Sequence, residues 1–213
     1  MNVKLKYEKV IDYFSQSMPV AETELHYNNP YELIVAVILS AQCTDKRVNI
    51  ITPFFYKRFP TPLDLSKASI EDIFAIIRSC SYPNNKAKNL SGMARMLVNE
   101  FNSQLPSDLD ELQKLPGVGR KTANVLASVL FNKPVIAVDT HVFRVSKRLG
   151  LVKNAKTPLA FEIQLTMHFP GELLPKVHHW LILHGRYVCL ARKPKCDVCG
   201  LAEICSFNNK AKV

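Results

Sequence analysis

The sequence predicts a mostly helical, all-α fold, and three observations lead to this expectation. Between residues 84 and 101, apolar side chains recur at the spacing of one helix face. Ser69 and Ser107 each supply a hydroxyl that is followed three residues later by a carboxylate, a pattern typical of helix N-termini. Prolines at positions 53 to 175 divide the chain into segments of helix length, and no series of alternating strands or hairpin turns interrupts them.

Along the chain, the first long apolar element is ambiguous. Residues 31–43 form a β-branched apolar run that fits a buried strand as well as a helix. Helices are then expected to begin near Ser69, to span residues 84–101 and to begin near Ser107. A further apolar helix is expected to end near Leu130.

Size and composition favour a globular protein. The 213 residues can bury one large or two small cores, and neither the 47% hydrophobic nor the 22% charged fraction is unusual. The first residues lack the apolar centre of a signal peptide, and the longest apolar run, residues 33–39, is too short to cross a bilayer. We therefore expect a protein of the cytoplasm, or of the nucleus in a eukaryote, that does not bind membranes.

The basic residues are concentrated in one part of the chain. The formal net charge is +10, and eight basic side chains but only one acid, Asp139, lie between Lys114 and Lys153. Such a local surplus suits a surface that follows the phosphates of a nucleic acid. A solvated helical face is the alternative.

Within this basic stretch, Gly117 and Gly119 allow a tight turn between two helices. Backbone N–H groups of such a turn can face a phosphate oxygen, although a plain helix connector explains the glycines equally well. Arg120 and Lys121 would then lie in the first helical turn, where the dipole disfavours cations, and a broken local rule often marks function. Arg120 could pair with phosphate. The helix dipole, the neighbouring Arg120 and any burial would favour the neutral form of the Lys121 amine, which is the nucleophilic form. The alternative is that Arg120 and Lys121 are both ordinary phosphate contacts.

Asp139 has two interpretations. It can cap a helix that begins at Thr140. It can also lie beside Lys121, where its carboxylate could take a proton or stabilise positive charge on a sugar.

Four cysteines lie within the last part of the chain and predict a metal centre rather than disulfides in a cytosolic protein. Structural zinc sites more often have two short Cys pairs, and only one is present, so the spacing favours an iron–sulfur cluster over zinc. The four are Cys189, Cys196, Cys199 and Cys205. Cys43 and Cys80 stand apart from them, and either can be a small buried hydrophobe.

Three histidines on one expected helix suggest a second metal site only weakly. His178 and His179 are not spaced three or four residues from His184, so the three would not share a helix face. We expect this segment to belong to the core.

Together these features resemble the endonuclease III family of helix-hairpin-helix DNA glycosylases, from about Glu22 to Cys205. The resemblance rests on five stretches: residues 40–45, 115–123, 138–141 and 178–186, and the six-two-five spacing of the cysteines. It implies one helical domain of residues 23–133 that contains the hairpin. A second domain would join residues 1–22 to 134–213 and carry a [4Fe–4S] cluster on its C-terminal loop.

The resemblance also implies roles for single residues. Lys121 matches the family's nucleophile and Asp139 its essential carboxylate, while Gln42 matches a side chain that enters the gap left by an extruded base. In the loop that wedges into DNA, this chain has Ser81, Tyr82 and Pro83 where Gly-Leu-Tyr-like residues are expected, so Tyr82 would be the wedge. Further DNA contacts are expected from Gly117, Gly119, Arg120, Thr122, His141, Arg144, Arg192, Lys193 and Lys195.

The activity implied is that of a bifunctional glycosylase and AP lyase of base excision repair, acting as a monomer. An oxidised pyrimidine is flipped out of duplex DNA. Lys121 attacks the sugar with help from Asp139, and β-elimination from the Schiff base cleaves the strand 3′ to the abasic site without a catalytic metal. Alternatives are an adenine-specific mismatch glycosylase, which lacks the lysine, a catalytically silent DNA-binding protein and an RNA-associated module.

Overall fold

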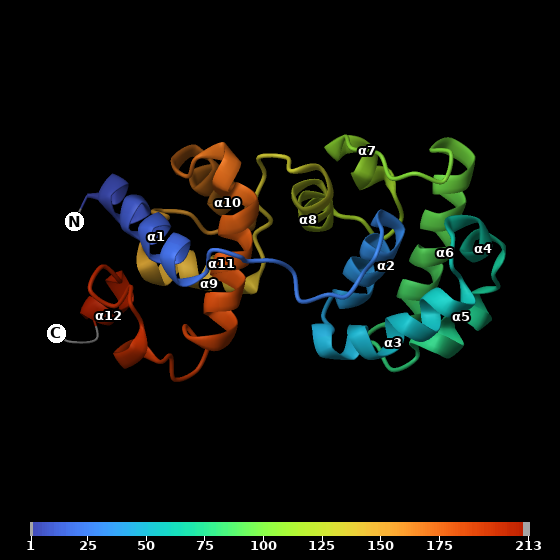
Figure 1. Ribbon diagram of the computed structural model, residues 1–213, viewed down its shortest axis with the longest axis horizontal. Coiled ribbons are helices and arrows are strands. Elements are labelled where there is room, and N and C mark those ends of the chain that lie inside the picture. Colours follow the sequence, from blue (N-terminus) through green and yellow to red (C-terminus); the bar gives the residue numbers. More distant parts are fainter. Residues whose placement is uncertain (1, 211–213) are drawn as a thin grey trace. The chain divides into compact units, whose positions relative to one another are not determined.

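The computed structural model describes residues 2–210, and these form helices joined by loops with no strand among them. The all-α prediction is therefore confirmed. The chain divides into two compact units (Figure 1). One is Thr23–Phe131, and the other combines the residues up to Glu22 with those from Asn132 onward. No helix in the described range is long and apolar enough to span a membrane.

The Thr23–Phe131 unit is built from seven helices. They are α2 (Pro30–Ser40), α3 (Asp45–Arg58), α4 (Pro62–Lys67), α5 (Ile70–Ile77), α6 (Pro83–Glu100), α7 (Leu109–Lys114) and α8 (Arg120–Phe131). Helix α6 packs against α2, α4 and α5, while α2 also packs against α3 and α8. The contacts of α2 place it at the centre of this unit.

Helix α2 resolves the ambiguity of the long apolar run. Asn29 caps it by accepting the N–H of Glu32 at 2.9 Å, and Pro30 lies in its first turn. Residues 31–39 are all buried. A helix that is buried on every side needs no polar face, so its sequence lacks the amphipathic period that would distinguish it from a strand.

The other predicted helix boundaries are mostly confirmed. Ser69 caps α5 by accepting the N–H of Asp72 at 3.0 Å, and the helical spacing of residues 84–101 corresponds to α6. Ser107 is not a cap, because Asp108 takes that position one residue later and accepts two backbone N–H groups of α7. Pro53 does not separate two segments either, since it lies inside α3.

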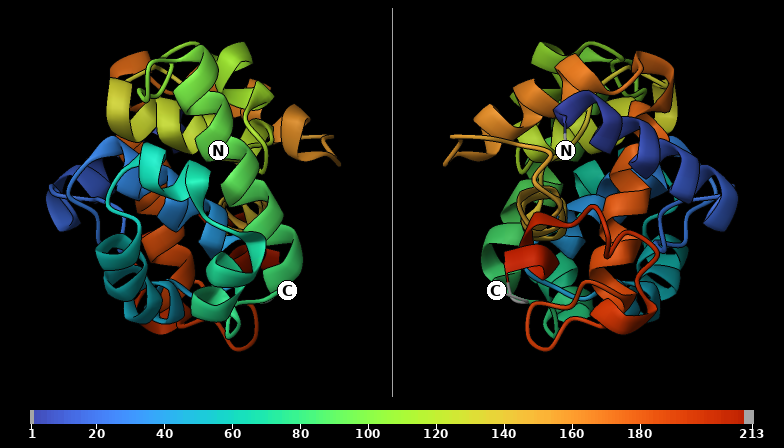
Figure 2. Two further views of the ribbon diagram at one scale, coloured as in Figure 1. Left: turned by 90° about the vertical axis from the view of Figure 1, so that its right-hand side faces the viewer. Right: turned by 90° about the vertical axis from the view of Figure 1, so that its left-hand side faces the viewer.

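The second unit contains α1 (Val3–Ser17), α9 (Thr140–Leu149), α10 (Pro158–His168), the 3-10 turn η1 (Gly171–Leu173), α11 (Leu174–Tyr187), the turn η2 (Cys196–Val198) and α12 (Ser206–Lys210). Its core joins the N-terminal helix to the C-terminal part of the chain. The right-hand view of Figure 2 faces the helices of this unit. Phe14 of α1 stacks on Trp180 of α11 with 5.7 Å between ring centroids. The indole N–H of Trp180 donates to the Met18 carbonyl at 2.7 Å.

Candidate functional site

The hairpin between α7 and α8 is anchored by buried apolar side chains. Leu115 and Val118 are nearly inaccessible, and the Val118 N–H donates to the Leu115 carbonyl at 3.0 Å. Pro116 faces Gly92 of α6, where a Cβ would approach the proline ring to 3.1 Å. The turn is therefore held by its own apolar residues, and its glycines remain on the outside.

The two glycines of the turn differ in what the fold requires of them. Gly117 has a φ of +83°, and a Cβ there would lie 2.9 Å from Cβ of Asn89. Both conditions demand glycine. A Cβ on Gly119 would meet nothing within 4 Å, and its φ lies outside the left-handed region. The fold itself does not explain Gly119, whereas close approach by an external group would.

Helix α8 starts directly after this turn. Arg120 and Lys121 are exposed in its first turn, Thr122 is half-buried, and that turn contains no acid. The sequence analysis placed both cations correctly at a helix start. Lys121 is exposed, so the burial that the sequence analysis considered is absent at this residue.

A second exposed feature of the same unit comprises the loops that carry Gln42 and Tyr82. Both residues are exposed and have a φ of 53°, so the backbone of each is in the left-handed region. The Ser81 hydroxyl donates to the Gln42 carbonyl, which ties the loops together. The structure thus brings together two residues that the sequence analysis connected only through the resemblance.

Lys86 holds the loop that carries Gln42 from the protein interior. Its side chain is buried, and its Nζ donates to the carbonyls of Leu39 at 2.7 Å and Ala41 at 2.8 Å. Burial lowers the pKa of Lys86. The sequence analysis missed this residue, although Lys86 is spaced four residues from the core residue Leu90, a signal that it lies on the buried helix face.

In the other unit, Asp139 caps α9. Its Oδ1 accepts the N–H of Val142 at 2.7 Å, which confirms the capping interpretation. The carboxylate is half-buried. The cap contact is made by one oxygen, so capping and a chemical role are compatible.

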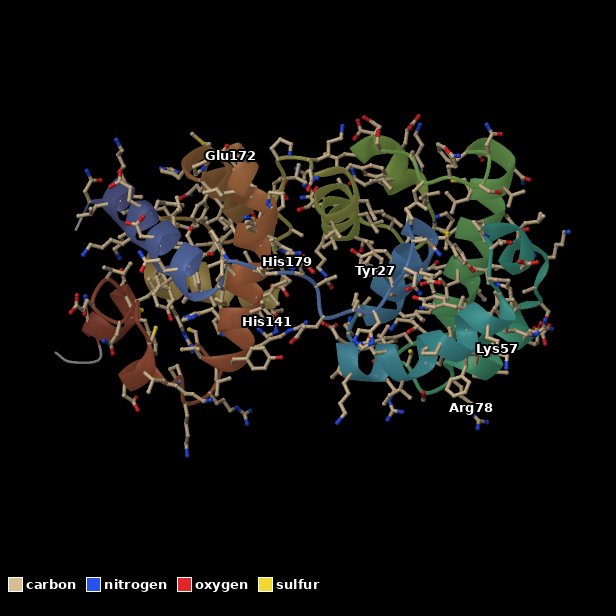
Figure 3. All side chains as sticks on the ribbon, in the orientation of Figure 1. Tyr27, Lys57, Arg78, His141, Glu172 and His179 are labelled. Carbon is tan, nitrogen blue, oxygen red and sulfur yellow. The ribbon has the colours of Figure 1, made fainter. Side chains whose placement is uncertain are left out.

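His141 lies in the first turn of the same helix, next to α11 (Figure 3). Burial lowers its pKa, with Arg144 and Arg186 acting in the same direction and Asp139 opposing them. A Cβ on Gly185 would lie 3.0 Å from the imidazole, so α9 and α11 approach closely because that position is glycine. A neutral imidazole can contact DNA by hydrogen bonding rather than by charge.

Arg144 is engaged within the protein. Its guanidinium donates to the carbonyl of Cys189 at 3.1 Å and to that of Gly185 at 2.9 Å, and it lies 3.2 Å from the His141 ring. The sequence analysis expected a DNA contact from this residue. The structure adds that Arg144 fastens α9 to α11 and to the loop that follows.

The four clustered cysteines line one pocket of the C-terminal region, together with Arg148 and His184. Burial and the neighbouring thiols raise the pKa values of Cys196 and Cys199. Mutual repulsion of this kind is relieved when iron binds the sulfur atoms as thiolates. Four thiols that face one pocket fit a [4Fe–4S] cluster.

A [4Fe–4S] cluster binds its four thiolates through different iron atoms, so its ligands need not meet at one point. Four thiols distributed around one pocket are compatible with this mode of binding.

Arg148 is a second residue that the sequence analysis missed. It donates to Cys189 Sγ at 3.4 Å, to the Leu190 carbonyl at 2.6 Å and to the Ala191 carbonyl at 3.0 Å. The Cys205 thiol in turn donates to the Arg148 carbonyl at 3.2 Å. No local pattern distinguishes this arginine from the other cations of the basic stretch.

The three basic residues of the cysteine loop, Arg192, Lys193 and Lys195, are all exposed. The histidines of α11 are instead buried: His178 lies 2.9 Å from the Ala137 carbonyl, and His184 lies 3.7 Å from Cys199 Sγ. The structure thus groups Gln42 with Tyr82 in one unit, and Asp139 with His141 and Arg144 in the other. Lys121 and Asp139 belong to different units, so their cooperation stays a prediction.

Comparison with known proteins agrees with these features. The family described as HhH-GPD superfamily base excision DNA repair protein matches residues 35–170, and the iron-sulfur binding domain of endonuclease III matches residues 189–205. Endonuclease III of Rickettsia conorii is 45% identical over 199 residues, which cover 93% of this chain and 94% of that protein. Endonuclease III of Bacillus subtilis is 44% identical over 210 residues, covering 99% and 95%.

A solved structure gives the same result for the fold. The structure of a trapped endonuclease III–DNA covalent intermediate, an estranged-adenine complex, matches with a TM-score of 0.94 and 43% sequence identity over 100% of both chains. The chain therefore belongs to the endonuclease III family of the HhH-GPD superfamily, whose members are DNA glycosylases of base excision repair, and it carries that family's iron–sulfur domain.

Proposed function

We propose that this protein is a bifunctional DNA glycosylase and AP lyase that removes oxidised pyrimidines and cleaves the strand 3′ to the abasic site. The observation that carries the proposal is the position of Lys121. Its amine is exposed in the first turn of α8, two residues after a glycine that the fold does not require. A related endonuclease III has been captured as a covalent intermediate with DNA, which supports covalent chemistry in this family.

The hairpin would hold the DNA backbone. Gly119 has open space around its Cα, so a phosphate oxygen could approach the backbone N–H groups that begin α8. The positive end of the helix, Arg120 and the Thr122 hydroxyl would add to this attraction. These contacts read no base and would fix the position of the duplex.

The loops of Gln42 and Tyr82 would act on the base pairs. Tyr82 is 62% exposed, and its ring could stack between bases as a wedge while the damaged nucleotide leaves the duplex. Gln42 would enter the space left behind. Because Ser81 links the two loops, the wedge and the space-filling side chain would move together.

The chemical steps would involve Lys121 and Asp139 at the same nucleotide. The Lys121 amine attacks C1′ while the base departs, and the Asp139 carboxylate accepts a proton or stabilises positive charge on the sugar. The resulting aminal nitrogen loses a proton, and its lone pair opens the sugar ring: the C1′–O4′ bond breaks, O4′ takes up a proton, and the iminium that forms acidifies the C2′ hydrogen. Removal of that hydrogen breaks the C3′–oxygen bond and leaves the strand cleaved by β-elimination.

The cysteine loop would contribute to binding rather than to chemistry. Cys189, Cys196, Cys199 and Cys205 would hold the [4Fe–4S] cluster, which when bound cross-links the loop through four thiolates. The loop would then present Arg192, Lys193 and Lys195 to phosphates. We take the protein to act as a monomer in the cytoplasm on chromosomal DNA that contains damaged pyrimidines or abasic sites.

The experiment is a borohydride trap. Purified protein is mixed with a duplex that contains thymine glycol, borohydride is added, and covalent adducts are separated by electrophoresis. Lys121→Gln should abolish the adduct, because only a Schiff base is reduced to a stable bond. Lys114→Gln, which removes an exposed lysine from the end of α7, is the matched control and should retain it.

Two further arms make the result decisive. An abasic duplex reports the lyase step alone, and an undamaged duplex reports non-specific trapping. An adduct that persists in Lys121→Gln would refute the nucleophile. Protein that binds the damaged duplex but forms no adduct with either substrate would refute the bifunctional mechanism.

A further inference from the structure

Two cysteines that the proposed reaction does not use lie side by side in the Thr23–Phe131 unit. The thiols of Cys43 and Cys80 are close enough to interact electrostatically, and the Ser81 hydroxyl, next to Cys80, donates to the carbonyl of Gln42, next to Cys43. Cys43 is partly exposed, whereas Cys80 is only 4% exposed, and neither forms a disulfide. The sequence analysis treated them as unrelated small hydrophobes, because 36 residues separate them in the chain.

The pair lies next to the two residues that we propose enter the DNA duplex, Gln42 and Tyr82. Cys43 directly follows Gln42, and Cys80 precedes Ser81, whose hydroxyl donates to the Gln42 carbonyl. The Cys43 N–H donates to the Ser40 carbonyl at 3.0 Å, and that of Cys80 donates to the Ile77 carbonyl at 2.8 Å. Each cysteine is therefore fixed to the end of a helix, so a bond between the sulfur atoms would act on both loops.

The surroundings of the two thiols give them different reactivities. Burial, followed by the neighbouring Cys43, raises the pKa of Cys80 to about 11, while Lys86 and Arg47 act in the opposite direction. Cys80 is thus a poor first nucleophile and is shielded from solutes. Cys43 is reachable, and the Lys86 ammonium interacts electrostatically with both sulfur atoms. A reachable thiol beside a shielded second thiol is the arrangement of a redox-sensitive pair.

We propose that Cys43 and Cys80 form a redox modification site, in which a small-molecule disulfide such as oxidised glutathione converts the pair into an intramolecular disulfide. The Cys43 thiolate attacks one sulfur of the reagent, which gives a mixed disulfide and releases one glutathione thiolate. The Cys80 thiol loses its proton, and its sulfur attacks Cys43 Sγ and releases the second glutathione. Two cysteines are oxidised, and one reagent disulfide is reduced to two thiols.

The disulfide would weaken DNA binding. A disulfide draws the two sulfur atoms to bonding distance and fixes the separation of the loops. Gln42 and Tyr82 would then move away from the positions in which both can enter the duplex. This consequence rests on the proposed function, whereas formation of the disulfide does not.

The experiment uses holoprotein with its cluster bound, incubated with oxidised or reduced glutathione. Intact mass and a non-reducing peptide map report the chemistry, with loss of two hydrogen atoms and a peptide linked through Cys43 and Cys80 as the expected result. Fluorescence anisotropy with a duplex carrying a stable abasic analogue reports binding. We expect about tenfold weaker binding after oxidation, restored by dithiothreitol.

Cys43→Ser and Cys80→Ala are the variants. Cys43→Ser should bind DNA equally well with either form of glutathione, whereas Cys80→Ala should retain one glutathione on Cys43, because no second thiol resolves the mixed disulfide. If Cys43 of the parent protein retains glutathione, or if no mass change occurs in the parent, the modification site is refuted. A linked peptide with unchanged anisotropy would refute the effect on binding but not the site. Reduced protein that fails to bind the abasic duplex would count against the proposed function, independently of the peptide map.

Discussion

Arg148 donates a guanidinium N–H to the sulfur of Cys189 at 3.4 Å and thereby joins α9 to the first ligand of the cysteine loop. The same side chain donates to the carbonyls of the next two residues, Leu190 and Ala191. It also lies over the Phe207 ring, 4.6 Å from its centroid. One arginine therefore holds the first three residues of the loop by hydrogen bonds, contacts α12 through Phe207 and leaves a positive charge next to the Cys189 sulfur.

Arg148→Met should consequently weaken retention of the cluster. A hydrogen bond to a charged group contributes about 1.5–3 kcal/mol, so we expect cluster release to a chelator to be faster by about tenfold or more. Iron content and the visible absorbance of the cluster measure the release. Lys147→Met removes the same charge from an exposed neighbouring position and should release iron at the parent rate. Equal rates for both variants would show that the contacts of Arg148 do not hold the loop.

The hairpin glycines should separate stability from DNA binding. Gly117→Ala places a side chain at a positive φ and against Asn89, so the free energy of unfolding should fall by about 1–3 kcal/mol. Gly119→Ala meets no atom of the protein and should change that free energy by less than about 0.5 kcal/mol. Its Cβ would instead obstruct a phosphate, and duplex affinity should fall roughly tenfold. Urea unfolding measures the free energy of unfolding, and fluorescence anisotropy measures the affinity for the duplex. An unchanged affinity of Gly119→Ala would exclude the close approach of a phosphate to this glycine.

Two substitutions of Asp139 can separate its role as a helix cap from its proposed role in catalysis. Asparagine caps helices as well as aspartate does, so Asp139→Asn should keep the contact to the Val142 N–H and the stability of α9. Asp139→Ala should lose about 1 kcal/mol of unfolding free energy. If the carboxylate acts on the sugar, both variants should release thymine glycol about 10²–10⁴ times more slowly than the parent. A fully active Asp139→Asn would reduce this residue to a helix cap.

His179 should make the second unit sensitive to acid. Burial, with help from Arg186, lowers the pKa of His179 from its ordinary value of 6.5 to about 4. Between these values the unfolded chain binds a proton that the folded chain does not. The contribution of His179 to the free energy of unfolding is therefore fully present above pH 6.5. It is lost as the pH drops towards 4, which lowers that free energy by up to about 3 kcal/mol.

The measurement is the unfolding free energy at several pH values for the parent and for His179→Gln. The variant should lose less stability between pH 6.5 and 4, because it has no imidazole to protonate. His26→Gln, which removes an exposed histidine from the other unit, controls for the loss of a histidine as such. Parallel curves for parent and His179→Gln would contradict the predicted coupling.

Local patterns account for the predictions that were correct. A helix cap joins residues three apart, so the roles of Ser69 and Asp139 could be predicted directly. The hairpin glycines and the cysteine spacing are likewise short segments. Such patterns predicted the all-α class, the start of α8 at Arg120 and a metal centre at the C-terminal loop.

The same local reasoning also explains the errors. Ser107 and Asp108 are both good caps, and only the backbone direction selects the second. Pro53 usually marks a boundary, yet tertiary packing keeps α3 intact around it. The burial of α2 on every side removed the periodicity that would have identified it as a helix.

By itself, the sequence determined what short segments encode: the helical class, the glycine turn that we propose binds phosphate, the position of Lys121 after it and the four thiols of the cysteine loop. Only the tertiary structure decided which distant residues meet. Lys86 contacts Leu39 and Ala41, and Arg148 contacts Cys189, across more than forty residues each. Cys80 likewise reaches Cys43 from another loop. The physical reason is that such contacts depend on how helices pack, and packing follows from the shape of a whole core rather than from any local spacing.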